Sequence, residues 1–247
     1  GKNNNRYHLM FGNFQMNKKD LTIFKSFEDI CRKTPSAPFL ISPSRAQKGM
    51  TTFSYQETFE KANKISAIFS DNGYGTNLRV ATLLGSTPAH YIVKLALNKI
   101  GISVVPINPD YSPDETAYLL EDSGSVLAIC AENYMKQLKT AIAHKNLSVP
   151  IVSYDEIETI QTLKSYPNFG APIDGKTEAS LLYTSGTTGR PKGCILSHEY
   201  ELMCGEVYAN IGAPISLSFG KDKILNPLPS YHINAGIVTF FAALLTG

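Results

Sequence analysis

The sequence predicts an α/β fold in which a mostly parallel sheet is flanked by helices on both faces. Short runs of Val, Ile and Leu alternate with helical segments between residues 79 and 154. These runs are continuously apolar, which is typical of parallel strands covered on both faces. Hydrophobic residues make up 43% of the 247 residues and charged residues 18%, as in an ordinary globular protein with a sizeable core.

The first elements precede this alternation. Ser26 is predicted to cap a short helix, which ends before Pro35. Short strands are expected over residues 39–41 and 52–55. A helix is expected over residues 55–71, because apolar residues recur there at helical spacing. The apolar stripe consists of Phe59, Ala62, Ile65, Ile68 and Phe69.

The alternating elements follow. Pro113 is expected at the first position of one helix, with Asp114 and Glu115 in its first turn, where acidic side chains complement the helix dipole. Strands are expected over residues 79–84, 102–107, 126–130 and 151–154, and helices over residues 87–100, 112–122 and 133–144.

Four parts are expected along the chain. They are an N-terminal segment (1–20), an α/β subdomain (21–155), a polar linker with Pro and Gly (156–178) and a segment with the candidate site residues (179–247). In the last part, helices are expected over residues 198–210 and 234–245.

Charge and cysteine content narrow the function classes. The net charge is only +2, from 23 basic and 21 acidic residues, so nucleic acid is not an expected partner. The four cysteines have no C-x-x-C spacing, which disfavours a zinc or redox site and suits a reducing compartment. The longest apolar run is too short to span a bilayer. We therefore expect a cytoplasmic protein without a membrane span.

A loop rich in glycine and hydroxyl groups lies between short strands expected at residues 181–183 and 195–196. Glycines let backbone N–H groups converge on an anion, hydroxyls add donors, and a lysine adds positive charge. The loop is not of the G-x-x-x-x-G-K-[ST] type, because Pro191 stands where that spacing requires glycine. On composition alone a surface turn is the commoner outcome. The candidate phosphate-binding residues are Thr184, Ser185, Gly186, Thr187, Thr188, Gly189 and Lys192.

Residues 183–193 read Tyr-Thr-Ser-Gly-Thr-Thr-Gly-Arg-Pro-Lys-Gly. Over these eleven residues the sequence resembles, without a break, the phosphate-loop signature of adenylate-forming enzymes. This superfamily includes acyl- and aryl-CoA synthetases, adenylation domains of peptide synthetases, and luciferases. Residues 53–55, 96–101 and 106–109 are similar to its N-terminal subdomain, so the resemblance implies that fold over about residues 26–247.

A second cluster of polar and aromatic side chains follows at residues 228–236. By itself it predicts little, since Tyr231 and His232 could simply pack. The segment from Pro229 to His232 is similar to the P-x-x-H segment that lines the acyl pocket of adenylate-forming enzymes. The resemblance therefore implies that His232, and with less weight Tyr231 and Asn234, border the carboxylic acid substrate. The pattern around His232 is closest to acyl-CoA synthetases, including carnitine-CoA ligase-like ones.

The resemblance implies a two-step reaction with ATP, Mg²⁺ and CoA: a small carboxylic acid forms an acyl-AMP and then a thioester. In that scheme residues 184–189 hold the β- and γ-phosphates, and Lys192 adds charge. No catalytic residue or metal ligand is assigned, because the superfamily's catalytic lysine and Mg²⁺-binding glutamate are expected beyond Gly247. The chain is then an N-terminal portion, inactive alone and completed by a C-terminal remainder of the same enzyme.

Two alternatives stay open. The first is an adenylation domain that loads the thiol of a carrier protein instead of CoA. The second is a non-catalytic nucleotide-binding protein that has kept the loop and lost the rest. A dinucleotide-binding protein is disfavoured, because no G-x-G-x-x-G segment follows a strand and opens a helix.

Overall fold

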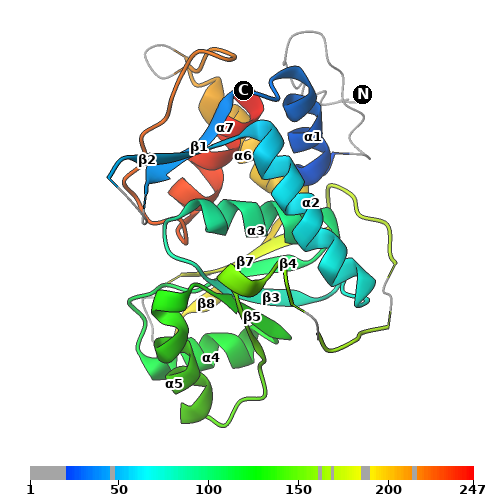
Figure 1. Cartoon of the computed structure of the whole chain (residues 1–247), viewed down its shortest axis with the longest axis vertical. Coiled ribbons are helices and arrows are strands. Elements are labelled where there is room, and N and C mark those ends of the chain that lie inside the picture. The colour runs from blue at the N-terminus through cyan, green and yellow to red at the C-terminus, as the bar shows by residue number, and fades with distance from the viewer. Residues whose placement is uncertain (1–20, 45–47, 161–162, 168–169, 185–189, 213–215) are drawn as a thin grey trace, which may run out of the picture.

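The computed structural model describes residues 21–44, 48–160, 163–167, 170–184, 190–212 and 216–247. At its centre lies a six-stranded sheet in the order β6-β5-β3-β4-β7-β8 (Figure 1). All neighbouring pairs are parallel except β7 and β8, which form an antiparallel hairpin. The predicted α/β class with a mostly parallel sheet is confirmed.

The strands of this sheet match the predicted apolar runs. Every residue of the central strands β4 and β5 is buried, which explains why their sequences do not alternate. The strands are β3 (Arg79–Leu83), β4 (Ser103–Pro106), β5 (Leu127–Cys130), β6 (Ile151–Ser153), β7 (Glu178–Thr184) and β8 (Lys192–Ser197). A separate antiparallel pair consists of β1 (Pro38–Pro43) and β2 (Met50–Ser54).

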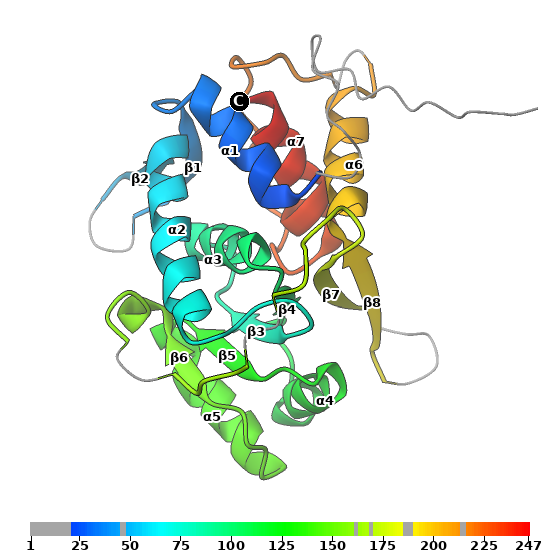
Figure 2. The same ribbon diagram turned by 90° about the vertical axis from the view of Figure 1, so that its right-hand side faces the viewer.

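Helices cover both faces of the sheet. In Figures 1 and 2, α4 and α5 lie on one face and α2 and α3 on the other, with α1, α6 and α7 stacked beyond α3. The helices are α1 (Ile23–Lys33), α2 (Tyr55–Asp71), α3 (Pro88–Lys99), α4 (Pro113–Ser123), α5 (Met135–His144), α6 (His198–Ala209) and α7 (Thr239–Thr246). Shorter turns are η2 (Glu132–Tyr134), η3 (Tyr154–Glu156) and η4 (Asn234–Val238), of which η4 is a π-helix.

Capping residues explain where two of these helices begin. Ser54 and Glu57 form a capping box at α2, whose bounds agree with the prediction. Ser112 and Glu115 form another at α4, with Pro113 at its first position as predicted. In both helices the capping box pairs two backbone N–H groups of the first turn that would otherwise lack a partner.

The predicted start of the first helix is wrong. Ser26 was expected as the N-cap, but α1 begins at Ile23 and is capped by Thr22, whose hydroxyl accepts a hydrogen bond from the Lys25 N–H at 3.3 Å. Ser26 is buried inside the helix. The helix starts earlier because Ile23 joins Phe27 on its buried face, and burial of apolar side chains outweighs the capping preference of Ser26.

A buried ion pair ties the sheet to the outer helices. Lys94 on α3 lies with its Nζ atom 2.8 Å from Oε2 of Glu201 on α6, and both side chains are almost completely buried. Lys94 also donates a hydrogen bond of 2.6 Å to the Ser180 hydroxyl on β7. Burial lowers the pKa of Lys94 and raises the pKa of Glu201, because it disfavours both charged forms.

Residues 179–247 complete the sheet that residues 79–153 begin, since β7 pairs with β4. The division into subdomain, linker and final segment stays a prediction. Helix α6 packs closely on α7 at Gly205. A side chain there would not fit, since its Cβ atom would lie only 2.4 Å from Cβ of Phe241. In the part of the chain that the structure describes, no helix is both long and apolar enough to cross a membrane.

Candidate functional site

The two arms of the candidate phosphate loop are the strands of the β7–β8 hairpin. Thr184, the last residue of β7, is the cross-strand partner of Lys192, the first residue of β8, and both are exposed. The structure thus brings together two of the predicted phosphate-binding residues at the open end of the hairpin. The other five, Ser185, Gly186, Thr187, Thr188 and Gly189, lie outside the described residues.

The end of the hairpin lies at the carboxyl edge of the parallel strands, because β7 runs parallel to β4. From this edge the chain leaves β3 towards α3 on one face and leaves β4 towards α4 on the other (Figure 1). When the connections from two neighbouring strands lead to opposite faces of the sheet, a crevice is left between them. Open α/β sheets bind their ligands in this crevice. The edge that carries Thr184 is therefore the expected place for a substrate.

The second predicted cluster lies over this same crevice. The backbone N–H of Ser230 donates to the Ser86 hydroxyl at 3.1 Å, and the Ser230 hydroxyl donates to the carbonyl of Gly85 at 2.9 Å. Gly85 and Ser86 follow β3. On the other side, burial and the charge of Asp110, which follows β4, raise the pKa of Tyr231. Hydrogen bonds thus anchor the turn that carries Tyr231 to the connection that leaves β3, and Tyr231 lies within electrostatic reach of Asp110 after β4.

His232 and its neighbours lie at the outer surface of this turn. His232 is exposed, and its ring centroid lies 4.7 Å from that of the half-buried Tyr231. Asn234 is exposed at the first residue of η4, and its Oδ1 accepts a hydrogen bond of 3.3 Å from Asn226. All three predicted substrate-binding residues are therefore adjacent, although their role stays a prediction.

Residues that sequence reasoning missed hold this turn in place. A Cβ atom at Gly236 would lie 2.1 Å from the Ser230 carbonyl oxygen, so only glycine permits the close approach. His90 lies fully buried beneath, and burial lowers its pKa to about 3, so it is neutral at pH 7. One indication in the sequence pointed to Ser86, which is a small polar residue in the Gly-Ser-Thr turn that follows an apolar strand.

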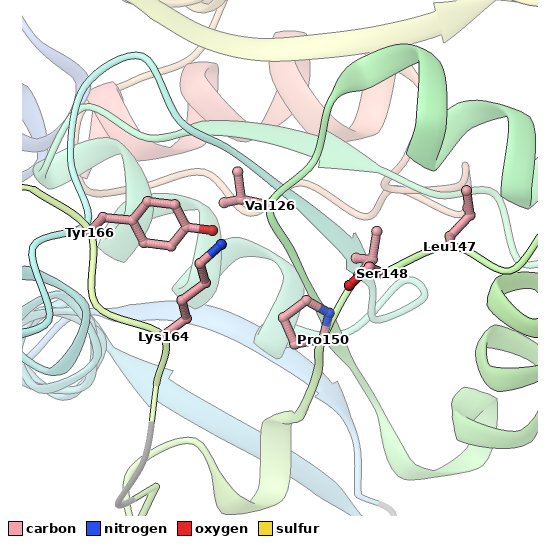
Figure 3. A pocket seen from close by; sticks show the side chains of 7 residues that line it. Val126, Leu147, Ser148, Pro150, Lys164 and Tyr166 are labelled. Atoms are coloured by element: carbon pink, nitrogen blue, oxygen red, sulfur yellow. The ribbon is translucent and has the colours of Figure 1, made fainter.

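Two of the cavities near the sheet help to place the candidate site. One, of about 250 Å³, adjoins the turn and is lined by residues that include Ser86, Tyr91, Asn226, Ala235 and Thr239. The other, of about 540 Å³, is shown in Figure 3 and lies where β5 and β6 begin, at the opposite edge of the sheet from Thr184. Val126, Leu147, Ser148, Val149, Pro150, Lys164 and Tyr166 line it. Among the described residues, none of the predicted site residues lines the second cavity.

The described part of the site contains no cluster of metal-binding side chains. Among the described residues, no group of three or more His, Cys, Asp and Glu side chains is arranged to hold a metal ion. The arrangement at the carboxyl edge instead combines one lysine, hydroxyl groups and a histidine, which suits an anionic substrate more than a resident metal.

The comparisons with known proteins identify the family of the chain. The model of the AMP-binding enzyme family matches residues 27–247, so the chain belongs to that family, the adenylate-forming superfamily. Among curated relatives, tyrocidine synthase 2 of Brevibacillus parabrevis is 28% identical over 237 residues, which are 93% of this chain and 6% of that protein. Surfactin synthase subunit 1 of Bacillus subtilis (strain 168) is 25% identical over 232 residues, which are 93% of this chain and 6% of that protein.

Solved structures share the fold. O-succinylbenzoate coenzyme A synthetase from Bacillus subtilis, in complex with ATP and magnesium ion, superposes with a TM-score of 0.72 at 21% identity. The match covers 90% of this chain and 55% of that one, so the chain spans about half of the synthetase. McyG A-PCP, complexed with phenylalanyl-adenylate, gives a TM-score of 0.73 at 20% identity, over 94% of this chain and 36% of that one.

Proposed function

We propose that the chain is the N-terminal part of an ATP-dependent ligase that joins a carboxylic acid to the thiol of CoA through an acyl-AMP. The observation that carries this proposal is the unbroken signature at residues 183–193, combined with the place of Thr184 and Lys192 at the carboxyl edge of the sheet. Membership of the AMP-binding family supports the use of ATP. The proposal goes beyond family membership in two respects, namely that the substrate is a carboxylic acid and that the thiol acceptor is CoA.

The first step joins the acid to the nucleotide. A carboxylate oxygen attacks the α-phosphorus of MgATP, a new P–O bond forms, and the bond to the β-phosphate breaks, so that pyrophosphate leaves. Such a reaction depends on positioning and charge stabilisation more than on covalent help from side chains. Residues 184–189 hold the β- and γ-phosphates, and Lys192 stabilises the negative charge of the departing pyrophosphate.

The second step transfers the acyl group. The sulfur of the thiol attacks the acyl carbon, the thiol proton passes to solvent, and AMP leaves with its electron pair. His232, with Tyr231 and Asn234 beside it, borders the acid at the crevice between the β3 and β4 connections. These residues select and orient the acid in both steps.

A second candidate acceptor is the thiol of a carrier protein. Peptide synthetases such as tyrocidine synthase 2 and surfactin synthase subunit 1 support this candidate, as does the resemblance to McyG A-PCP. The chemistry at the AMP-binding site is the same for both acceptors, so the described residues fit either. The fatty acyl CoA synthetase of Mycobacterium tuberculosis and the O-succinylbenzoate enzyme support CoA.

The test uses the whole protein encoded by the gene. Exchange of radioactive pyrophosphate into ATP is measured with a panel of aliphatic, aromatic and amino acids, and thioester formation is then measured with CoA and with a phosphopantetheinylated carrier protein. We expect exchange that depends on one class of acid, and a CoA thioester. Transfer to the carrier alone would replace CoA as acceptor, and no exchange with any acid would support a non-catalytic nucleotide-binding protein.

A further inference from the structure

Helix α4 contacts both arms of the β7–β8 hairpin next to the candidate phosphate loop. Figure 2 shows α4 close to the start of β8. Two side chains one turn apart on α4, Tyr118 and Asp122, make the contacts. Neither residue belongs to the signature at residues 183–193, and the proposed mechanism gives them no role.

The first contact fixes the β7 arm. The Tyr183 hydroxyl donates a hydrogen bond of 2.7 Å to Oδ2 of Asp122. Burial, followed by this bond, raises the pKa of Tyr183, so the phenol keeps its proton. The ring of Tyr183 lies across Gly193, its cross-strand partner, since a Cβ atom there would be 3.3 Å from Cζ of Tyr183. Tyr183 thus joins β7, β8 and α4 one residue before Thr184.

The second contact fixes the β8 arm. The Tyr118 hydroxyl donates a hydrogen bond of 3.3 Å to the carbonyl of Pro191, the residue before Lys192. The guanidinium carbon of Arg190 lies 5.1 Å from the centre of the Tyr118 ring, a cation–π distance. Arg190 therefore faces α4, and Lys192 is left as the cation of the hairpin mouth among the described residues.

Helix α4 is a rigid support for these contacts. Its first turn is held by the capping box of Ser112 and Glu115, and Leu119 and Leu120 on its inner side are buried against the sheet. Tyr118 and Asp122 are four residues apart and lie on one face. Anchoring both arms to one helix restricts how far Thr184 and Lys192 can separate, since each of these residues directly follows an anchored position.

We propose that Tyr118 and Asp122 are positioning residues that hold Thr184 and Lys192 at the separation needed to bind the polyphosphate of ATP. This inference rests on the proposed function. Ordering the mouth of the hairpin before the ligand arrives reduces the entropy lost on binding. Polyphosphate affinity therefore depends on α4 side chains that do not touch the ligand.

The test compares three ligands on the whole protein: MgATP, inorganic pyrophosphate and AMP. Tyr183→Phe and Asp122→Ala each remove one partner of the first contact, and Tyr118→Leu removes the second. Tyr118→Phe, which keeps the ring under Arg190, is the milder variant. Tyr208→Phe on α6 and Glu121→Ala, the neighbour of Asp122 on α4, are matched controls.

We expect the dissociation constants for MgATP and pyrophosphate to rise about 3- to 10-fold in Tyr183→Phe and Asp122→Ala. The double variant is expected to bind within about twofold of either single variant, because both singles break the same bond. AMP affinity and the thermal midpoint are expected to stay close to those of the controls, because AMP has no β- or γ-phosphate.

Unchanged polyphosphate affinity in all four variants would overturn the positioning role while leaving the proposed function intact. An equal loss of AMP and pyrophosphate binding would also overturn it, because it would indicate general damage to the fold. If the unaltered protein bound neither MgATP nor pyrophosphate, the proposed function itself would fall, and the positioning role with it.

Discussion

The side chain of His198, at the start of α6, accepts a hydrogen bond at Nδ1 from the backbone N–H of Ile23, at the start of α1, with a length of 3.1 Å. The two residues are 175 positions apart in the sequence. His198 is completely buried, and burial lowers its pKa from the ordinary 6.5 to about 3. The neutral ring is required here, because a protonated Nδ1 is a donor and has no lone pair to accept this bond.

This bond predicts loss of stability in mild acid. His198 and the buried His90 both have a pKa of about 3 when folded and 6.5 when unfolded, so below pH 6.5 the unfolded chain binds more protons. The free energy of unfolding therefore falls as the pH is lowered, by about 1 kcal/mol for each histidine between pH 7 and 5.5. Urea unfolding at pH 7 and at pH 5.5 measures this change in the free energy of unfolding.

The control for this prediction is a pair of substitutions. His198→Asn, which keeps an acceptor and does not titrate, is expected to remove about half of the pH dependence. His144→Asn, which changes a histidine that is about half exposed, is the matched control. Equal slopes for the wild type and His198→Asn would contradict the assignment.

The buried pair of Lys94 and Glu201 predicts a strongly coupled pair of substitutions. Lys94→Met or Glu201→Leu alone leaves an uncompensated buried group and is expected to destabilise the fold by about 3–5 kcal/mol. The double variant is expected to recover most of this loss, because apolar side chains of similar volume fill the same space. Chemical denaturation of the wild type, both single variants and the double variant gives the coupling energy. If the losses of the two single variants simply added in the double variant, the predicted coupling would be refuted.

Lys192 is expected to act in the first step of the proposed reaction. Lys192→Ala removes the cation at the mouth of the hairpin and should slow adenylation about 10- to 100-fold. Thioester formation from supplied acyl-AMP should change less, because pyrophosphate has already left. Single-turnover rates of the two steps separate these effects. Lys164→Ala, at the cavity on the opposite edge of the sheet, is the matched control, and an unchanged first step would count against Lys192.

His232 is expected to influence which acids are accepted. His232→Ala removes the imidazole that is proposed to border the acid, so the ratio of kcat/KM for a larger and a smaller acid should shift about tenfold. His144→Ala, an exposed histidine on α5, should not shift it. A panel of acids in the pyrophosphate-exchange assay measures the ratio, and an identical profile would remove His232 from the substrate pocket.

Much of the fold was predictable, because local patterns decide it. The stripe from Phe59 to Phe69 predicts α2 over its observed range, and the apolar runs predict every strand of the large sheet. The start of α1 was not predictable from Ser26, because Ile23 gains more from packing than the cap gains from its hydroxyl. The local pattern also gave no sign of the π-helical geometry of η4.

The sequence suggested candidate site residues, whose roles stay predictions, but it gave no sign of the contacts that support them. The signature at residues 183–193 identified the hairpin mouth from the sequence alone. The contacts that hold it, from Tyr118 to Pro191 and from Asp122 to Tyr183, join residues 73 and 61 positions apart. A single sequence contains no periodic signal for such pairs, because only the folded chain brings them together.

The π-helical turn η4 has a consequence for comparing and engineering this family. A π turn contains one residue more than the α turn it replaces, as if a residue had been inserted into the helix that leads to α7. Relatives with a regular helix here would align with a one-residue gap within residues 234–238. Deleting one residue there would convert the turn to α-helix and leave the preceding segment, including His232, in nearly the same phase around the axis of α7, because each kind of turn closes about one full revolution.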